Sequence, residues 1–383
     1  MKLFFFITKS EAGGAQTHVA QLTKFFVARG DEVAIMSAPD GWLEQEALRL
    51  GAHFFPNPHL SNSLNPWRFL QAAKTLTNAV HDFQPDLIAC HSTVAGLLGR
   101  FVIRNRIPTV FTAHGWGFQP GAPRPRRVLL PILERLAARF CVKIICVSQN
   151  DLALARAHHI APPEKLTQIY NGVEMPDLLS LRSLDPPSTH STSSGQAGSG
   201  SLGMTRIIFI GRLAPPKNPY LLIRAVAALP QTLRDRVRVI VIGDGPEMTA
   251  LQDFVRESQL GNQVDLPGAL PREEVLRRLQ TQADLFVLLS SWEGFPYSII
   301  EAMACGVPVI ASDVGGVREA ITSQTGILLT HNDIQTLSQA LEQLIQNPKQ
   351  RKAMGEQAHL AAQKKFSVDQ MYEATLAVYQ SLV

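Results

Sequence analysis

The chain has 383 residues, 45% of them apolar and 18% charged, which is enough to bury the cores of two ordinary globular domains. Its 36 basic and 32 acidic residues leave a net charge of only +4, which does not indicate a nucleic-acid partner. The four cysteines are scattered without a CxxC spacing and indicate neither a zinc site nor a disulfide framework, so we expect reduced thiols in a cytoplasmic protein.

The first half of the chain alternates short apolar runs with amphipathic stretches, which predicts strands and helices of a parallel, doubly wound sheet. The apolar run at the N-terminus is too short for a signal peptide, and no stretch is long enough to cross a bilayer. We expect strands at 3–7, 32–37, 53–55, 87–91, 109–113, 143–147 and 166–169. We expect helices within 13–29 and at 43–50, 66–81, 93–104, 126–139 and 150–158.

The segment 174–203 is rich in Ser and Gly and has almost nothing to bury, so it predicts a linker or insertion. A second alternation follows, with strands expected at 206–210, 238–242, 264–266, 285–289, 307–311 and 326–329. Helices are expected at 220–228, 248–258, 273–282, 298–304, 317–321, 334–345, 348–364 and 367–382. These patterns predict domains at 1–173 and 204–366, with the last helix (367–383) packing back on the first domain and a cleft between the two.

Two carboxylates, Glu293 and Glu301, lie between two apolar strands with seven residues between them. Glu293 sits in a loop at the carboxyl end of a strand, where open α/β sheets bind ligands. Glu301 is expected in the first turn of the next helix, whose amides favour anions. A structural alternative stays open, because Ser298 and Glu301 have the spacing of a capping box.

Two loops of the first half carry residues that suit a ligand site. Gly13 and Gly14 follow the first strand and open a helix, so the backbone can approach an anion, although a plain turn would look the same. The GxGxxG dinucleotide fingerprint is missing there. His114 follows the strand at 109–113 beside a glycine, which would let it reach a ligand, although a lone histidine is often structural.

The second half has a basic loop directly after its first strand. Arg212 and Lys217 are five residues apart and could both reach one diphosphate, with Arg as a planar fork and Lys as a point charge. Gly243 and Gly245 follow the next strand and allow a tight turn beside a base or phosphate. The chain has no Asp-x-Asp, so cations and helix amides, rather than a bound metal, are expected to neutralise a diphosphate.

The basic run Arg124–Arg127 precedes an apolar helix. Cations beside an exposed apolar helix face can dock on anionic lipid, whereas a solvated loop ahead of a core helix is the alternative.

In order along the chain, these stretches resemble the family 4 retaining glycosyltransferases with the GT-B fold, in which two Rossmann-like domains face each other across a cleft. The resemblance covers nearly the whole chain and is strongest from Thr205 to Gly326, which includes the E-x7-E pair and Asp313-Val314-Gly315-Gly316. It implies an acceptor-side first domain and a nucleotide-sugar donor domain. One departure is Gln16, where many members carry an acid.

The resemblance also implies roles for particular residues. Arg212, Lys217 and His114 would be catalytic, with the two cations neutralising the donor diphosphate. Donor-sugar contacts would come from Glu293, Gly294, Phe295 and Pro296, and nucleotide contacts from Glu301, Gly211, Gly243 and Gly245. An acceptor or phosphate loop would use Gly13, Gly14, Gln16, His18 and Asn171. No metal or other cofactor is expected.

The expected activity is therefore sugar transfer with retention from a nucleotide sugar, UDP-linked, to a glycan or lipid-linked acceptor in cell-surface polysaccharide synthesis. The protein would work in the cytoplasm, with peripheral contact at the inner membrane face through Arg124–Arg127. An epimerase or phosphorylase of the same fold and a non-catalytic sugar-nucleotide-binding protein remain alternatives. The donor base and sugar, the acceptor and the oligomeric state stay open.

Overall fold

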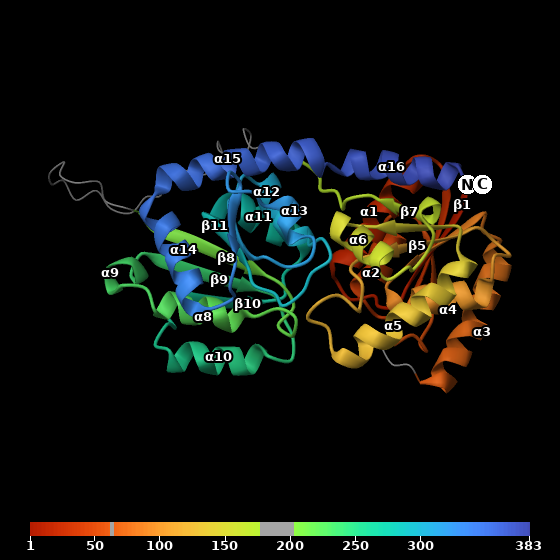
Figure 1. Cartoon of the computed structure of the whole chain (residues 1–383), viewed down its shortest axis with the longest axis horizontal. Coiled ribbons are helices and arrows are strands. Elements are labelled where there is room, and N and C mark those ends of the chain that lie inside the picture. Colours follow the sequence, from red (N-terminus) through yellow and green to blue (C-terminus); the bar gives the residue numbers. More distant parts are fainter. Residues whose placement is uncertain (62–64, 177–202) are drawn as a thin grey trace. The chain divides into compact units, whose positions relative to one another are not determined.

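The computed structural model describes residues 1–61, 65–176 and 203–383. The chain divides into two compact units, each with its own sheet (Figure 1). Unit 1 comprises Met1–Asn171 and Asp369–Val383, and unit 2 comprises Gly172–Val368. The expected Ser/Gly linker at 174–203 lies, apart from its first three residues and its last, outside the described residues.

Unit 1 is built on a seven-stranded sheet with the order β3-β2-β1-β4-β5-β6-β7. All its neighbouring strands pair in parallel, as predicted from the alternation of apolar runs and amphipathic stretches. The strands are β1 (Lys2–Ile7), β2 (Glu32–Ser37), β3 (His53–Pro56), β4 (Leu87–His91), β5 (Thr109–Ala113), β6 (Lys143–Cys146) and β7 (Leu166–Gln168).

Helices cover both faces of this sheet. They are α1 (Gly14–Ala28), α2 (Trp42–Arg49), α3 (Pro66–Phe83), α4 (Thr93–Ile103), α5 (Arg124–Ala137), α6 (Gln149–Ala157) and α16 (Val368–Gln380), with short 3-10 turns at Ala138–Phe140 and Pro163–Lys165. Successive β1 side chains point to opposite faces. Phe4 and Phe6 join the core shared with α3 and α4, whereas Phe5 packs toward Phe26 of α1.

The last helix, α16, belongs to unit 1 from Asp369 onward. Tyr372 stacks on Phe25 of α1 with ring centroids 4.5 Å apart, and Tyr379 stacks on Phe26 at 5.6 Å. Tyr379 is fully buried, so this end of the chain completes a core that begins with the first strand.

Unit 2 holds a six-stranded parallel sheet with the order β10-β9-β8-β11-β12-β13. Its strands are β8 (Thr205–Ile210), β9 (Val237–Ile242), β10 (Val264–Gly268), β11 (Leu285–Leu288), β12 (Val309–Ser312) and β13 (Gly326–Leu329). Its helices are α8 (Pro219–Ala227), α9 (Gln231–Arg234), α10 (Met248–Glu257), α11 (Arg272–Gln282), α12 (Tyr297–Ala304), α13 (Val317–Ala320), α14 (Ile334–Gln346) and α15 (Pro348–Lys365). The predicted fold class, two doubly wound parallel sheets, is confirmed.

One local prediction is wrong. The capping box requires α12 to start just after Ser298, but α12 begins at Tyr297, and Pro296 is its N-cap residue without a side-chain cap. Pro296 has the restricted φ of proline and starts the helix one turn before Glu301. Glu301 is thus the fifth helical residue, not a first-turn residue, and no longer has the capping spacing.

Candidate functional site

The strand order of each sheet reverses at its centre, between β1 and β4 in unit 1 and between β8 and β11 in unit 2. In doubly wound sheets, ligands bind outside the carboxyl ends of the strands at this switch point. The predicted donor residues Arg212, Lys217 and Glu293 follow β8 and β11. Of the residues predicted in unit 1, Gly13 and His18 follow β1, so both sets fall at a switch point.

Lys217 and Glu293 form the charged centre of unit 2. Nζ of Lys217 donates to Oε1 of Glu293, and Oγ of Ser290 donates to the same oxygen at 2.6 Å. Both charged side chains are mostly buried, with 16% and 13% of their area exposed. The structure therefore brings together two residues that the sequence separates by 76 positions, and it adds Ser290 as a third partner.

The loops that carry these two residues are held together by their backbones. Lys217 and Ser290 form an antiparallel bridge, the Asn218 amide donates to the Leu289 carbonyl at 2.9 Å, and the Ser291 amide donates to Pro216 at 3.0 Å. The Ser290 amide in turn donates to Oγ of Ser312 at the end of β12. Because backbone bonds fix both loops, the ammonium and the carboxylate are positioned before any ligand arrives.

Gly243 and Gly245, the glycines predicted to lie beside the phosphates, allow the loop after β9 to pack closely against the loop after β8. Gly243 has φ +144°, and a Cβ there would lie 2.0 Å from the carbonyl oxygen of Gly211. A Cβ on Gly245 would lie 2.4 Å from the carbonyl oxygen of Leu213. Any side chain at Gly243 or Gly245 would push the β9 loop off the β8 loop, so these positions require glycine for packing whether or not they touch a nucleotide.

The other predicted donor residues differ in exposure. Arg212 is exposed and makes no ion pair within the part of the chain that is described, so its guanidinium is available to a ligand.

Phe295 is buried, and its ring lies 5.1 Å from that of Phe366. Its side chain therefore belongs to the core, and only its backbone amide remains a candidate contact. The Gly294 carbonyl accepts from the Gly316 amide, which ties this loop to the Asp313–Gly316 turn.

Glu301 lies in α12 with 6% of its area exposed and pairs with Arg272 at the start of α11. Nη1 of Arg272 is 2.5 Å from Oε1 of Glu301, as an ion pair rather than an aligned hydrogen bond. Arg272 was not predicted from the sequence. The pair shows that Glu301 is held by a cation of another helix and not by its own helix start.

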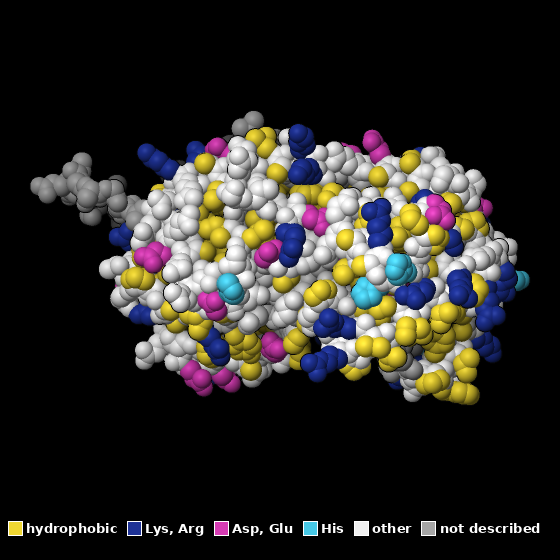
Figure 2. All heavy atoms as spheres, in the orientation of Figure 1, with side chains coloured by type: hydrophobic (Ala, Val, Ile, Leu, Met, Phe, Trp, Pro, Cys, Tyr) yellow, Lys and Arg dark blue, Asp and Glu magenta, His cyan; other side chains and the backbone are white. Residues whose placement is uncertain are grey.

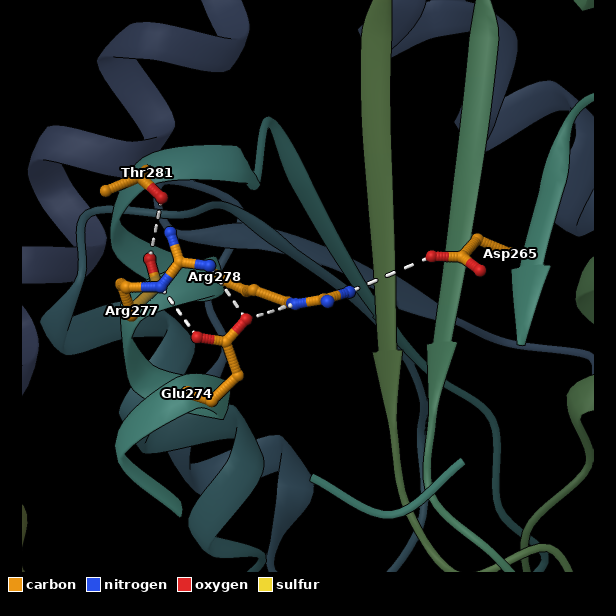
Figure 3. A network of polar contacts seen from close by, with 5 residues as sticks. All are labelled: Asp265, Glu274, Arg277, Arg278 and Thr281. Carbon is orange, nitrogen blue, oxygen red and sulfur yellow. Dashed lines mark hydrogen bonds and ion pairs between the residues drawn. The ribbon is translucent and has the colours of Figure 1, made fainter. Parts of the chain in front are cut away.

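The helix that carries Arg272 is itself anchored by a charged network (Figure 3). Glu274 accepts from Arg277 and Arg278, and Arg278 also reaches Asp265 of β10 at 3.8 Å. Figure 3 shows Arg278 extending from α11 between Glu274 and Asp265. Hydrogen bonds from the two arginines lower the pKa of Glu274, so this carboxylate stays charged and holds both side chains.

In unit 1, Gly13 is the extended N-cap residue of α1 and Gly14 its first residue. Nε2 of Gln16 donates to the Lys9 carbonyl at 3.1 Å, and Oε1 of Gln16 occupies the space that a Cβ of Gly13 would fill. Gln16 thus folds back on the loop between β1 and α1, where the sequence predicted an acceptor contact. The amides of this loop remain the groups that a ligand could meet.

Three histidines meet at the switch point of unit 1. Nδ1 of His18 is 3.2 Å from Oδ1 of Asn171, and Nδ1 of His91 is 3.1 Å from Nε2 of His114. The ring of His18 lies 4.8 Å from that of His114 and 5.5 Å from that of His91. His18, Asn171 and His114 were predicted. His91, the last residue of β4, was missed, although it satisfies the strand-end criterion that selected His114.

Burial controls the charge of this cluster. It lowers the pKa of His18 to about 4, although the hydrogen bond with Asn171 works in the other direction. Burial also holds the pKa of His91 and that of His114 well below the usual value, and the nearby His18 lowers both further. All three imidazoles are therefore neutral at pH 7 and can act as hydrogen-bond donors or acceptors without carrying charge.

Among the residues that the structure describes, these histidines form the group that could hold a metal ion, since one ring nitrogen of each lies within 4.8 Å of the others. Metal-bound imidazoles normally donate their second N–H to an acceptor. Nε2 of His91 and Nδ1 of His114 are buried and have no such partner. The cluster fits imidazole–imidazole hydrogen bonding better than metal ligation.

Two further features lie away from these groups. Arg124–Arg127 forms the exposed first turn of α5 in unit 1. In unit 2, an open hollow of about 500 Å³ lies between α8 and the start of α14, and none of the predicted donor residues lines it. No described helix has an apolar stretch long enough to span a membrane.

Two family models match the chain. Residues 12–175 match "Glycosyltransferase Family 4" and residues 201–360 match "Glycosyl transferases group 1". Together they cover every strand of the two sheets except β1, and they include the predicted site residues of each half. The chain belongs to these glycosyltransferases and has the GT-B fold that the sequence predicted.

Individual relatives agree with this assignment. The chain is 29% identical over 294 residues to an Escherichia coli UDP-Gal:alpha-D-GlcNAc-diphosphoundecaprenol alpha-1,3-galactosyltransferase, covering 74% of this chain and 72% of the relative. It is 28% identical to a D-inositol 3-phosphate glycosyltransferase of Jonesia denitrificans, over 97% and 91% of the two chains. The structure of Anabaena Alr3699/HepE in complex with UDP-glucose is similar over 100% of both chains, with TM-score 0.79 and 22% identity.

Proposed function

We propose that this glycosyltransferase moves a sugar, with retention, from a UDP-linked donor to a lipid-linked glycan in cell-surface polysaccharide synthesis. The observation that carries the proposal is the backbone-fixed Lys217–Glu293 pair beside the exposed Arg212 at the switch point of unit 2. The E. coli relative is named for a UDP-Gal donor and a diphosphoundecaprenol-linked acceptor, and another E. coli relative is an O-antigen biosynthesis glycosyltransferase.

Breaking the bond to the sugar makes negative charge grow on the departing diphosphate while the sugar becomes oxocarbenium-like. Arg212 and Lys217 neutralise that charge, and Lys217, which is fixed in advance by Glu293 and by its loop, needs little reorganisation during the reaction. The Glu293 carboxylate accepts hydrogen bonds from the sugar hydroxyls, and the backbone amides of Gly294 and Phe295 donate hydrogen bonds to them. Glu301 accepts from the ribose hydroxyls while Arg272 fixes its carboxylate.

Retention follows from a same-face mechanism in this proposal. Glu293 is already shared by Lys217 and Ser290, and Glu301 is paired with Arg272, so neither is placed as a free nucleophile. A leaving phosphate oxygen takes the proton from the acceptor hydroxyl, which attacks from the side that the phosphate leaves. No metal cofactor is required, since the two cations supply the charge.

The acceptor side is assigned to unit 1. The amides at Gly13 and Gly14 meet phosphate or acceptor oxygens, and the neutral His114 forms a hydrogen bond with a sugar hydroxyl. His18 and Asn171 orient the imidazole cluster. Because the acceptor is lipid-linked, the enzyme works peripherally at the cytoplasmic face of the membrane, with Arg124–Arg127 on the contacting surface.

A thermal-shift screen of nucleotide sugars tests the donor assignment. We expect UDP and one UDP-sugar to raise the melting temperature, because a ligand that binds only the native state stabilises it. GDP-sugars should not. Stabilisation by a GDP-sugar alone would reject the UDP donor, and conversion of the UDP-sugar without any acceptor would indicate an epimerase. A transferase product whose anomeric proton signal in NMR shows inverted configuration would reject retention.

A further inference from the structure

We propose that the outer face of α5 docks on an anionic lipid bilayer. Four large apolar side chains of this helix are exposed to solvent, by 64%, 58%, 52% and 41% of their area: Val128, Leu129, Ile132 and Leu136. Leu129, Ile132 and Leu136 follow Val128 by one, four and eight residues, which places all four side chains on one side of a helix. They form a continuous apolar stripe along α5, which we call the α5 stripe.

The inward face of α5 makes the stripe unusual. Glu134 is 1% exposed and accepts from Nη2 of the fully buried Arg100 of α4 at 2.5 Å. Pro131 and Ala137 complete this buried face. A surface helix normally turns its apolar side to the core and its charges to water. Here a charged residue points inward and the apolar stripe points outward, so the stripe is not part of the core packing.

The exposed charges of α5 are all positive. Arg124, Arg126, Arg127 and Arg135 are exposed, and the helix's acidic residue, Glu134, is the buried one. A helix with an outward apolar stripe and flanking arginines binds in the plane of an anionic membrane, with the stripe in the acyl boundary and the arginines at the headgroups.

A neighbouring helix extends the same surface. Trp67 and Leu70 of α3 are 70% and 62% exposed, and Arg68 between them is also exposed. Both α3 and α5 pack against α4, so their outer faces belong to one layer of unit 1. Figure 2 shows hydrophobic and basic side chains gathered where Figure 1 places α3, α4 and α5. Tryptophan is enriched at membrane interfaces, which fits this position.

The positive charge of α5 favours a bilayer over a second copy of the chain as the partner that covers the α5 stripe. A two-fold dimer through the α5 stripe would bring the arginines of two copies to the same interface, with no exposed acidic residue of α5 to meet them. Anionic headgroups neutralise the arginines instead. The inference rests on the proposed function, which places Arg124–Arg127 at the membrane, and deepens it by assigning the α5 stripe as the surface that contacts lipid. Vesicle binding tests it separately from the donor assignment, because the vesicle assay needs no nucleotide sugar.

Vesicle sedimentation of the full chain tests the inference. The wild-type protein should bind vesicles that contain phosphatidylglycerol, bind phosphatidylcholine vesicles weakly, and lose binding as salt screens the arginines. The double variant Leu129→Ser/Ile132→Ser should weaken binding by about tenfold or more, since it removes apolar area from the contact. Arg126→Gln/Arg127→Gln should also weaken it by about tenfold or more.

Matched controls come from α2 of the same unit. Leu48 is 62% exposed and the Arg49 side chain 66%, so Leu48→Ser and Arg49→Gln remove comparable groups and should leave vesicle binding unchanged. Circular dichroism checks folding, and the thermal shift with UDP-sugar checks the donor site separately. Failure of the wild-type chain to bind phosphatidylglycerol vesicles at low salt would overturn the inference. So would a wild-type dimer that Leu129→Ser/Ile132→Ser converts to a monomer, because the stripe would then be a protein interface.

Discussion

The two units use the same strand-order reversal to present opposite chemistry. At the switch point of unit 2, Lys217 and Glu293 are charged and Arg212 is exposed. At the switch point of unit 1, three imidazoles that are buried or partly buried are neutral at pH 7. The topology therefore determines where a ligand binds, whereas the side chains after each strand determine which part of a ligand can be held there.

This difference matches the two chemical demands of sugar transfer. A leaving diphosphate needs fixed positive charge, which the unit 2 loops supply. Sugar hydroxyls need hydrogen-bond partners without a strong field, which neutral imidazoles and helix amides supply. The predictions below test this division, beginning with the largest expected effect.

Removing the fixed cation should affect turnover most. Lys217→Ala is expected to lower kcat by on the order of 10²-fold or more, as for a lost oxyanion donor. The control is Arg256→Ala, which removes an exposed cation of α10 in the same unit and should leave kcat unchanged. Steady-state kinetics with the UDP-sugar identified by the thermal screen measure both, and an unchanged kcat in Lys217→Ala would remove the lysine from the mechanism.

The neutral cluster should make the stability of unit 1 sensitive to acid. The pKa of His18 is about 4 in the folded chain and 6.5 in the unfolded chain, so the unfolded chain binds more protons between these values. The contribution of His18 to the free energy of unfolding is complete above pH 6.5 and is lost as the pH falls through 4. This loss is on the order of 3 kcal/mol. Denaturant unfolding followed by hydrogen exchange of unit 1 peptides measures it.

The control for this pH effect is His81→Asn, which removes a histidine whose side chain is 82% exposed. The slope of unit 1 stability between pH 4 and 6.5 should be the same in this variant and smaller in His18→Asn. Equal slopes in the wild type and His18→Asn would contradict the neutral cluster.

Glu301 should affect donor affinity rather than turnover. Glu301→Gln is expected to raise the donor KM by about tenfold, because a hydrogen bond to a charged group contributes about 1.5 kcal/mol. Arg272→Gln should raise it less, since the arginine only positions the carboxylate. A lower melting temperature with an unchanged KM in Glu301→Gln would limit Glu301 to a structural ion pair.

The smallest effect is expected from removing metal. Extended treatment with EDTA should leave kcat unchanged, because the proposed mechanism neutralises the diphosphate with Arg212 and Lys217. Mg²⁺ added back afterwards should also have no effect. A loss of activity with EDTA that a divalent cation restores would assign the charge neutralisation to a metal.

The sequence predicted the fold class and the position of several candidate residues after strand ends, because these signals are local. Apolar runs mark buried parallel strands, and residues such as Lys217, Glu293 and His114 follow those runs directly. Their placement at strand ends needs no knowledge of distant contacts. The sequence could therefore predict which strand-end loops carry these candidate residues.

The partners of those residues depend on tertiary packing and were not predicted. Arg272 reaches Glu301 from another helix, and nothing in the local sequence of either helix signals the pair. The prediction that Glu301 lies in the first turn of its helix was wrong because α12 starts after Pro296, one turn before Glu301, and this start also removes the capping-box alternative. His91 could have been found, since it ends a buried strand as His114 follows one.

A calorimetric measurement of UDP and uridine binding tests most directly whether the diphosphate is held by the charged residues of unit 2 and not by the neutral histidines of unit 1. The account predicts that UDP binds the wild-type chain much more tightly than uridine does, and that Lys217→Ala removes most of the difference. His114→Ala should leave the affinity for UDP unchanged. Equal affinities for UDP and uridine in the wild type, or a loss of UDP binding in His114→Ala as large as in Lys217→Ala, would contradict it.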